Sequence, residues 1–375
     1  MKQIIFNNKN SINQLRTIIL NDNPNNILLV TGKKSFSKSG SEKMINKLFE
    51  GFKFFRYSDF EFNPKYEDVI KCLNILNKYE FDYIVTIGGG SVIDFAKLVN
   101  IGAHNNDLFK DFPNNINNIK CRGSKFIAIP TTSGSGTEAT HFAVLYFQGR
   151  KFSIANKFLY PDIVLLDSTL TLSLSPNQTA ISGIDAFCQS IESYWSVNST
   201  DESLDYSLSA LKLILKHLPN AVNNNCKFAK EKMIYASYLA GKAINIAKTT
   251  GAHALSYSLT SKHGITHGQA VALTIAEWYR YNLFNYKNLS DNRGLNYYQN
   301  KMKKINILFS NDENKIVKEI KKFIVKCNLS VNLSDFNLSS EDLNELVENI
   351  NLQRLKNNPI FIDKKEIYNL LVKSL

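Results

Sequence analysis

Hydrophobic residues in the first half of the chain form short β-rich runs that alternate with segments of helical periodicity. The runs predict strands at residues 27–31, 53–57, 82–87, 125–129 and 163–167. The intervening segments 39–51 and 66–79 predict helices, and the pair 142–146 and 151–154 predicts a hairpin. Because strands and helices alternate, we expect an α/β fold with a Rossmann-like parallel sheet.

From about residue 170 the hydrophobic period becomes that of helices. Apolar residues recur at helical spacing in segments 183–196, 201–218, 229–248, 267–281, 315–327, 340–355 and 364–375. Ser340 is expected to open one of these helices, with acidic Glu341 and Asp342 in its first turn. We therefore expect two domains, an α/β domain over residues 1–178 and an all-helical domain over residues 179–375.

A glycine triplet follows the predicted strand 82–87 and precedes an amphipathic segment. Gly88, Gly89 and Gly90 allow a tight turn and close approach of a bulky anion, and the helix after Ser91 points its N-terminus at that anion. The spacing differs from G-x-G-x-x-G and from the P-loop. Gly32 and Thr131 also follow predicted strands, at the edge where parallel sheets bind ligands. This pattern predicts a phosphate-binding cradle.

The helical half contains a candidate metal site. Asp185 and Gln189 are four residues apart and share one helix face, while His253 and His267 lie farther along the chain. One carboxylate, one amide and two imidazoles suit Fe²⁺ or Zn²⁺ with a position open for substrate. The alternative is that the two histidines are ordinary core or turn residues.

Charge and cysteine content exclude several classes of protein. The net charge is +12, but the lysines are dispersed among asparagines and form no basic stripe with aromatics, so we expect no nucleic-acid partner. Five scattered cysteines argue against a disulfide framework and a cysteine zinc site. No apolar run reaches the ~20 residues of a membrane span, and the N-terminus lacks a secretory signal. A cytoplasmic enzyme is the expectation.

Four motifs follow one another along the chain: Gly88-Gly-Gly-Ser-Val-Ile-Asp94, Pro130-Thr-Thr-Ser-Gly-Ser-Gly-Thr-Glu138, Gly183-Ile-Asp185, and His253 with His267-Gly268. In this order they resemble the iron-containing (group III) alcohol dehydrogenases, whose fold is similar to that of dehydroquinate synthase. The resemblance runs from about residue 20 to 285 and implies a metal-dependent NAD(P) oxidoreductase. It also implies a homodimer.

The resemblance assigns roles to individual residues. It places the cofactor pyrophosphate at Gly88, Gly89, Gly90 and Ser91, with Asp94 one turn on, and implies further cofactor contacts from Thr131, Thr132, Ser135 and Lys151. It implies one divalent metal, Fe²⁺ or Zn²⁺, on Asp185, Gln189, His253 and His267. Two residues depart from the family pattern. Gln189 replaces a histidine ligand, and Tyr257 replaces a second, non-ligating histidine, so proton relay would use Tyr257, a water or the cofactor ribose.

The residues after the first predicted strand bear on the type of cofactor. Gly32, Lys33, Lys34 and Ser35 include no acidic residue to hold a ribose 2′-hydroxyl, and the lysines and Ser35 suit a 2′-phosphate. This favours NADP(H) over NAD(H). The alternative is that both lysines are solvated loop residues.

The implied reaction is hydride transfer between nicotinamide and a small aldehyde or alcohol, with the metal as Lewis acid. Segments 192–200 and 249–260 are similar to the phosphonoacetaldehyde reductase (hydroxyethylphosphonate dehydrogenase) subgroup, so we expect reduction of phosphonoacetaldehyde to 2-hydroxyethylphosphonate. Candidate cations for the anionic substrate are Lys248, Lys262, His263, His141 and Arg150. The alternatives are a generic short-chain alcohol dehydrogenase, a reductase of another small anionic aldehyde, a dehydroquinate synthase-like lyase and a metal-free binding protein.

Overall fold

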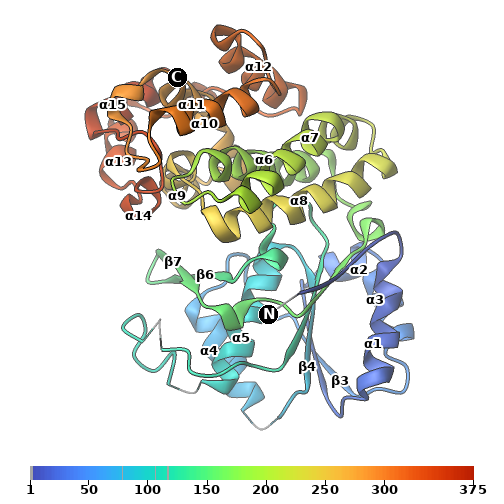
Figure 1. The fold of residues 1–375 in the computed structure, drawn as a ribbon. Helices are drawn as coiled ribbons and strands as arrows, with labels where there is room; N and C mark the ends of the chain where they lie inside the picture. The colour runs from blue at the N-terminus through green and yellow to red at the C-terminus, as the bar shows by residue number, and fades with distance from the viewer. Residues whose placement is uncertain (1–2, 78, 106, 116–117) are drawn as a thin grey trace. The chain divides into compact units, whose positions relative to one another are not determined.

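The computed structural model of the chain describes residues 3–77, 79–105, 107–115 and 118–375. It divides into two compact units, Met1–Leu174 and Ser175–Leu375. The first unit contains a parallel sheet with helices, and the second is helical (Figure 1). The predicted fold class is confirmed.

Six strands of the described first unit form one parallel sheet in the order β1-β8-β5-β4-β2-β3. Its strands are β1 (Ile4–Asn7), β2 (Ile27–Thr31), β3 (Phe54–Tyr57), β4 (Tyr83–Gly88), β5 (Lys125–Pro130) and β8 (Ile163–Leu166). The helices of this unit are α1 (Gln14–Asp22), α2 (Ser35–Lys38), α3 (Ser41–Leu48), α4 (Tyr66–Leu76) and α5 (Gly90–His104). Strands β6 (Phe142–Phe147) and β7 (Arg150–Ala155) form the predicted antiparallel hairpin.

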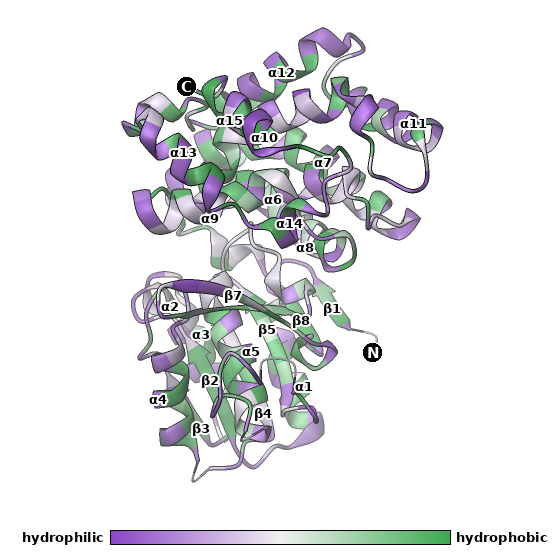
Figure 2. Ribbon diagram, turned by 90° about the vertical axis from the view of Figure 1, so that its left-hand side faces the viewer, coloured by the Kyte–Doolittle hydropathy of each residue, from purple (hydrophilic) through white to green (hydrophobic). Residues whose placement is uncertain are grey.

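Helices cover both faces of the sheet. Alternate strand residues such as Leu29, Val85 and Ile127 share one buried cluster with Leu15 of α1 and Ile45 of α3. Helices α4 and α5 lie on the opposite face (Figure 1). The central strands are accordingly hydrophobic along their length (Figure 2), as expected for a parallel sheet buried on both sides.

The second unit consists of helices around one hydrophobic core. They are α6 (Pro176–Trp195), α7 (Asp201–Asn223), α8 (Lys227–Ala247), α9 (Gly251–His263), α10 (His267–Phe284), α11 (Leu295–Asn306), α12 (Glu313–Lys326), α13 (Ser340–Glu348), α14 (Leu352–Leu355) and α15 (Lys364–Val372). Among the described residues, no helix has the length and hydropathy of a membrane span.

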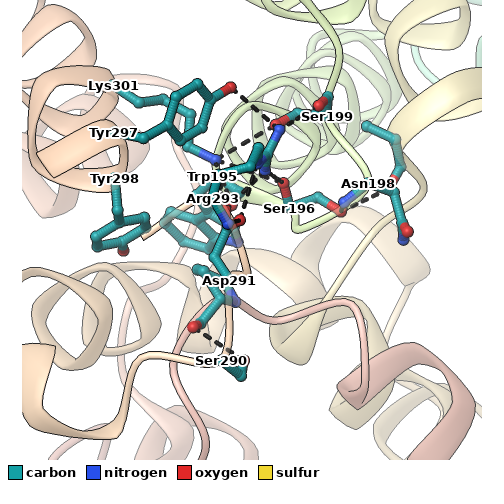
Figure 3. Close-up of polar contacts among 12 residues, drawn as sticks. Trp195, Ser196, Asn198, Ser199, Ser290, Asp291, Arg293, Tyr297, Tyr298 and Lys301 are labelled. Atoms are coloured by element: carbon teal, nitrogen blue, oxygen red, sulfur yellow. Dashed lines mark hydrogen bonds and ion pairs between the residues drawn. The ribbon is translucent and has the colours of Figure 1, made fainter. Parts of the chain in front are cut away.

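Helix α6 is held firmly at both ends. Ser175 caps its N-terminus in a reciprocal capping box with Gln178. At the other end, Lys301 donates to the carbonyl oxygen of Trp195 and Arg293 donates to that of Ser196 (Figure 3). Cationic groups at a helix C-terminus satisfy its last carbonyls and complement its dipole. Both ends of the helix that carries Asp185 and Gln189 are therefore fixed.

Three elements lie where the hydrophobic pattern gave no signal. Strand β1 is an edge strand whose Ile4 is largely exposed, and α1 follows it without strong amphipathicity. Helix α11 is rich in lysine and asparagine, so its few buried residues do not stand out. In each case packing on neighbouring elements outweighs a weak local pattern.

The predicted helix 340–355 is two helices. Ser339, rather than Ser340, caps α13 through a capping box with Asp342. The chain leaves the helix after Glu348, and the Asn351 side chain then caps α14 by accepting from the backbone N–H of Arg354. An asparagine that bonds to nearby backbone competes with helix continuation. This break turns α14 into a separate element.

Candidate functional site

The candidate cofactor residues of the first unit gather at one edge of its sheet. Gly32 follows β2, Gly88 ends β4 and Thr131 follows β5, and these three strands are neighbours. The backbone N–H of Thr131 donates to the carbonyl oxygen of Gly88 at 3.0 Å. The carboxyl ends of adjacent parallel strands therefore bring these loops together, at the edge where such sheets bind ligands.

Gly88 and Gly90 of the glycine loop, residues 88–91, are packed too tightly to carry side chains. A Cβ on Gly88 would lie 2.5 Å from Val92, and one on Gly90 would lie 2.7 Å from Ser135 Oγ. No side chain caps the N-terminus of α5, whose N-cap is Gly89. A close-packed glycine turn followed by an uncapped helix start fits a phosphate group. The chain thus has a suitable place for a dinucleotide pyrophosphate.

Asp94 and Lys97 are buried on α5 and hold the neighbouring segment 137–144. Asp94 accepts from Thr137 Oγ1 and from the backbone N–H of Val144. Lys97 donates to the carbonyl oxygens of Thr137 and Thr140. Burial raises the pKa of Asp94 and lowers that of Lys97 to about 8. Asp94 therefore engages the protein itself, and Lys97 is an organising residue that sequence analysis missed.

The remaining predicted cofactor residues lie around the same edge. Thr132 is close to Gly89, since a Cβ on that glycine would lie 3.2 Å from the threonine methyl. Lys151 is half-buried on β7, and its charge lowers the pKa of Asp94 against the larger effect of burial. Lys34 and Ser35 stand at the start of α2.

The residues that directly follow β2 include no acidic side chain, but the structure brings one beside the end of this strand. Asp59, from the loop after β3, forms an ion pair of 2.8 Å with Lys33 and another with Lys71. These two lysines lower the pKa of Asp59 to about 2. Arg56 of β3 donates from Nε to Thr31 Oγ1 at 2.9 Å. The parallel pairing of β2 with β3 brings both groups to a site that the local sequence could not show.

The second unit brings together three predicted metal ligands. Asp185 of α6, His253 of α9 and His267 of α10 offer ligand atoms that all lie within 4.8 Å of one another. Asp185 Oδ1 is 3.3 Å from His253 Nε2 and 3.9 Å from His267 Nε2. Gln189, one turn after Asp185 on α6, is also buried. We call these four residues the candidate metal centre.

Glu192 supports the candidate metal centre from behind, and sequence analysis missed it. Its Oε2 atom is hydrogen-bonded to His253 Nδ1, and its Oε1 atom accepts from the backbone N–H groups of Thr250, Ala252 and His253. The side chain is fully buried. A carboxylate on one imidazole nitrogen fixes the tautomer that presents the other nitrogen to a metal.

The electrostatics of the centre favour positive charge. Burial alone would lower the pKa of His253, but the carboxylates of Glu192 and Asp185 outweigh burial and raise that pKa to about 9. His253 and Asp185 are nearly buried, whereas the His267 side chain is 36% exposed. The open side of the centre is therefore at His267.

The donor set fits a divalent cation. Ligands about 2.1 Å from an ion in tetrahedral geometry lie roughly 3.4 Å apart, close to the observed separations between Asp185 and the two imidazoles. One carboxylate and two imidazoles, one of them oriented by Glu192, are typical ligands of Fe²⁺ and Zn²⁺. The amide of Gln189 would add a neutral oxygen from the same helix.

Tyr257 lies one turn after His253 on α9 and contacts a residue far away in sequence. Arg354 Nε donates to the Tyr257 hydroxyl oxygen at 3.1 Å, and Arg354 Nη1 donates to Thr249 Oγ1 at 2.8 Å. Because a guanidinium has only donors, the tyrosine oxygen accepts in this bond and its hydrogen is directed elsewhere. Helix α14 thereby joins the surroundings of the candidate metal centre.

Comparison with known proteins gives consistent matches along the chain. The family model "Iron-containing alcohol dehydrogenase" matches residues 2–168, and "Fe-containing alcohol dehydrogenase family, C-terminal" matches residues 179–375. A NADPH-dependent butanol dehydrogenase of Clostridium saccharobutylicum is 31% identical over 284 residues, 74% of this chain and 72% of that protein.

Two further proteins are similar to this chain. Long-chain-alcohol dehydrogenase 1 of Geobacillus thermodenitrificans is 35% identical over 229 residues, 60% of this chain, and the match spans only 58% of that relative's own length. The crystal structure of sulfoacetaldehyde reductase from Bifidobacterium kashiwanohense in complex with NAD⁺ superposes with a TM-score of 0.87 at 29% identity. This superposition covers 99% of this chain and 96% of that one.

Proposed function

Because the chain belongs to the iron-containing alcohol dehydrogenase family, we propose that it interconverts a small aldehyde and its primary alcohol with NAD(P)(H) and a divalent metal. The observation that carries the proposal is the convergence of Asp185, His253 and His267 within 4.8 Å. Such a cluster of a carboxylate and two imidazoles, with one exposed member, suits a metal that accepts a substrate oxygen.

The two units supply different parts of this chemistry. In the first unit, the cofactor would be held by the glycine loop together with the other residues at the same sheet edge, namely Gly32, Lys33, Lys34, Ser35, Thr131, Thr132, Ser135 and Lys151. Asp94 would contribute by positioning the segment 137–144. In the second unit, Asp185, Gln189, His253 and His267 would hold the metal. When bound, the nicotinamide supplies a hydride and the metal polarises the carbonyl oxygen.

Two side chains of the second unit would orient a metal ligand and supply a proton. Glu192 holds His253 in the tautomer whose Nε2 faces Asp185. Reduction of an aldehyde also needs a proton on the new alkoxide oxygen. Tyr257 is our candidate donor, because it lies one turn after His253 on α9 and Arg354 Nε holds its hydroxyl group in place.

For the cofactor, we favour NADP(H) over NAD(H). The support is the positive charge at this position: the Arg56 side chain of β3 bonds to Thr31 at the end of β2, near Lys33 and Lys34, and arginine suits a 2′-phosphate. Asp59 opposes this preference because it neutralises Lys33 and could accept from a ribose hydroxyl. Comparing kcat/KM for NADPH and NADH tests the preference, and a higher value for NADH would reverse it.

For the substrate, we favour phosphonoacetaldehyde, reduced to 2-hydroxyethylphosphonate. The support is the similarity to a sulfoacetaldehyde reductase, whose named substrate is also a two-carbon aldehyde with a tetrahedral anionic group. The second candidate is an uncharged short-chain aldehyde, favoured by the 31% identity to a butanol dehydrogenase.

One assay separates the candidates. Purified protein loaded with Fe²⁺ or Zn²⁺ is mixed with NADPH or NADH and phosphonoacetaldehyde, sulfoacetaldehyde or butanal, and the absorbance of the reduced cofactor is followed. Turnover that a chelator abolishes and added metal restores supports the proposal. A preference for the anionic aldehydes supports the phosphonate assignment, and faster reduction of butanal supports the second candidate. Inactivity with every aldehyde and both cofactors would refute the oxidoreductase proposal.

A further inference from the structure

Arg354 differs from the other arginines of the second unit in lacking an acidic partner. Residues 175–375, all of which the structure describes, contain Arg280, Arg293 and Arg354. Arg280 pairs with Glu277 and Arg293 pairs with Asp291. The Arg354 side chain donates to two neutral hydroxyl oxygens, those of Tyr257 and Thr249. Its positive charge is therefore held in place without being neutralised.

The position of Arg354 relates it to the candidate metal centre. Thr249 and Tyr257 lie four residues before and four residues after His253, so a guanidinium that bonds to both lies alongside the turn that carries His253. Tyr257 and His253 are four residues apart on α9, so they share a face and are separated by about 6 Å along the helix axis. A two-carbon aldehyde with a terminal anionic group could span a distance of this order.

The side chain is also pre-oriented. The Asn351 cap fixes the first turn of α14, and the backbone N–H of Asn351 donates to the carbonyl oxygen of Ala254 on α9 at 3.4 Å. Two of the five guanidinium N–H groups are used by Tyr257 and Thr249, and the others remain to form a planar fork. A fixed guanidinium loses little freedom on binding and matches the oxygens of a phosphonate or sulfonate bidentately.

We propose that Arg354 binds the anionic group of the substrate and selects aldehydes that carry a terminal tetrahedral oxyanion. This inference rests on the proposed function and specifies its substrate class. Tyr257 and Thr249 act as positioning residues for the guanidinium. Lys262, one of the cations named from the sequence, is engaged in an ion pair with Glu345.

The test compares charged and uncharged substrates in matched variants. Arg354→Gln removes the charge, Arg354→Lys keeps a point charge without the fork, and Arg280→Gln removes a surface arginine from α10 as the control. We expect Arg354→Gln to raise KM for phosphonoacetaldehyde and sulfoacetaldehyde by about 10- to 100-fold, as expected for the loss of charged hydrogen bonds. KM for butanal should change less than about threefold by the same reasoning. Arg354→Lys should recover part of the loss, and Arg280→Gln should behave as the wild type.

Direct binding keeps the test independent of turnover. Calorimetric titration of 2-hydroxyethylphosphonate should show a dissociation constant about 10- to 100-fold higher in Arg354→Gln than in the wild type. Equal affinities, or equal losses with charged and uncharged aldehydes, would overturn the role of Arg354. If butanal is reduced but the Arg354 variants treat charged and uncharged aldehydes alike, only the proposed role of Arg354 fails. Inactivity with all aldehydes would refute the proposed function. The titration would still show whether Arg354 binds the anionic group.

Discussion

The contact between Gly268 and Ile181 predicts that one added methyl group will disturb the candidate metal centre. A Cβ at position 268 would overlap the backbone carbonyl oxygen of Ile181. Gly268 directly follows His267 on α10, and Ile181 is one turn before Asp185 on α6. Because the obstacle is backbone, Gly268→Ala must push the two helices apart at the point where both carry predicted ligands.

The magnitude follows from the packing. Relieving the overlap requires a shift of about 1 Å, and overpacking of this kind costs about 1–3 kcal/mol of unfolding free energy. A shift of about 1 Å is several times the roughly 0.2 Å tolerance of a metal–ligand bond. We therefore expect Gly268→Ala to weaken metal affinity at least about 10-fold, the lower range for losses from misoriented ligands.

The assay measures unfolding and metal affinity separately. Urea titration gives the unfolding free energy, and competition with a chromophoric chelator gives metal affinity. The control is Gly40→Ala in the first unit, since Gly40 has φ +78° with nothing near its Cβ position. This control should lose roughly 1–2 kcal/mol through backbone strain and keep its metal affinity. Wild-type metal affinity in Gly268→Ala, or equal metal loss in both variants, would refute the reasoning.

Three other predictions concern single side chains. Glu192→Gln should weaken metal affinity by about 10- to 100-fold with little change in circular dichroism, because it loses the carboxylate that orients His253; unchanged affinity would contradict that role. Gln189→His should retain more metal on dialysis, since imidazole binds these cations better than an amide, and unchanged metal content would remove Gln189 from the ligand set. Burial raises the pKa of Glu138 to about 7 from an unfolded value near 4.5, so its neutral form stabilises the fold below pH 4.5 and this contribution is lost as pH rises through 7. The stability advantage of the wild type over Glu138→Gln should fall between pH 5 and 7, and a constant difference in urea unfolding would contradict this.

Much of the fold could be predicted because its signals are local. The buried strands β2, β4 and β5 are continuous apolar runs, and the helices of the second unit repeat apolar residues at helical spacing. Elements with weak local patterns were missed. Strand β1 is exposed at the sheet edge, and the break between α13 and α14 depends on the Asn351 cap.

In the candidate site too, local spacing revealed some residues and only packing revealed the others. Spacing suggested Asp185 and Gln189 as a pair, because residues four apart on a helix share a face. It could not suggest Glu192 as the partner of His253, nor Asp59 as the partner of Lys33, since helix packing and strand pairing bring these residues together. The resemblance to a family implied candidate ligand positions but gave no information on Arg354.

The sequence by itself determined the two-part architecture, the glycine loop and the candidate metal-ligating pair Asp185 and Gln189, since these depend on hydrophobic period and on short-range spacing. Only the tertiary structure decided which charges are paired and which are left to act on a ligand. Arg354 and Tyr257 are 97 residues apart in sequence, and their contact exists because α14 packs on α9. Electrostatic interactions act through space, so the charge that a substrate meets depends on the packing of elements that are distant along the chain.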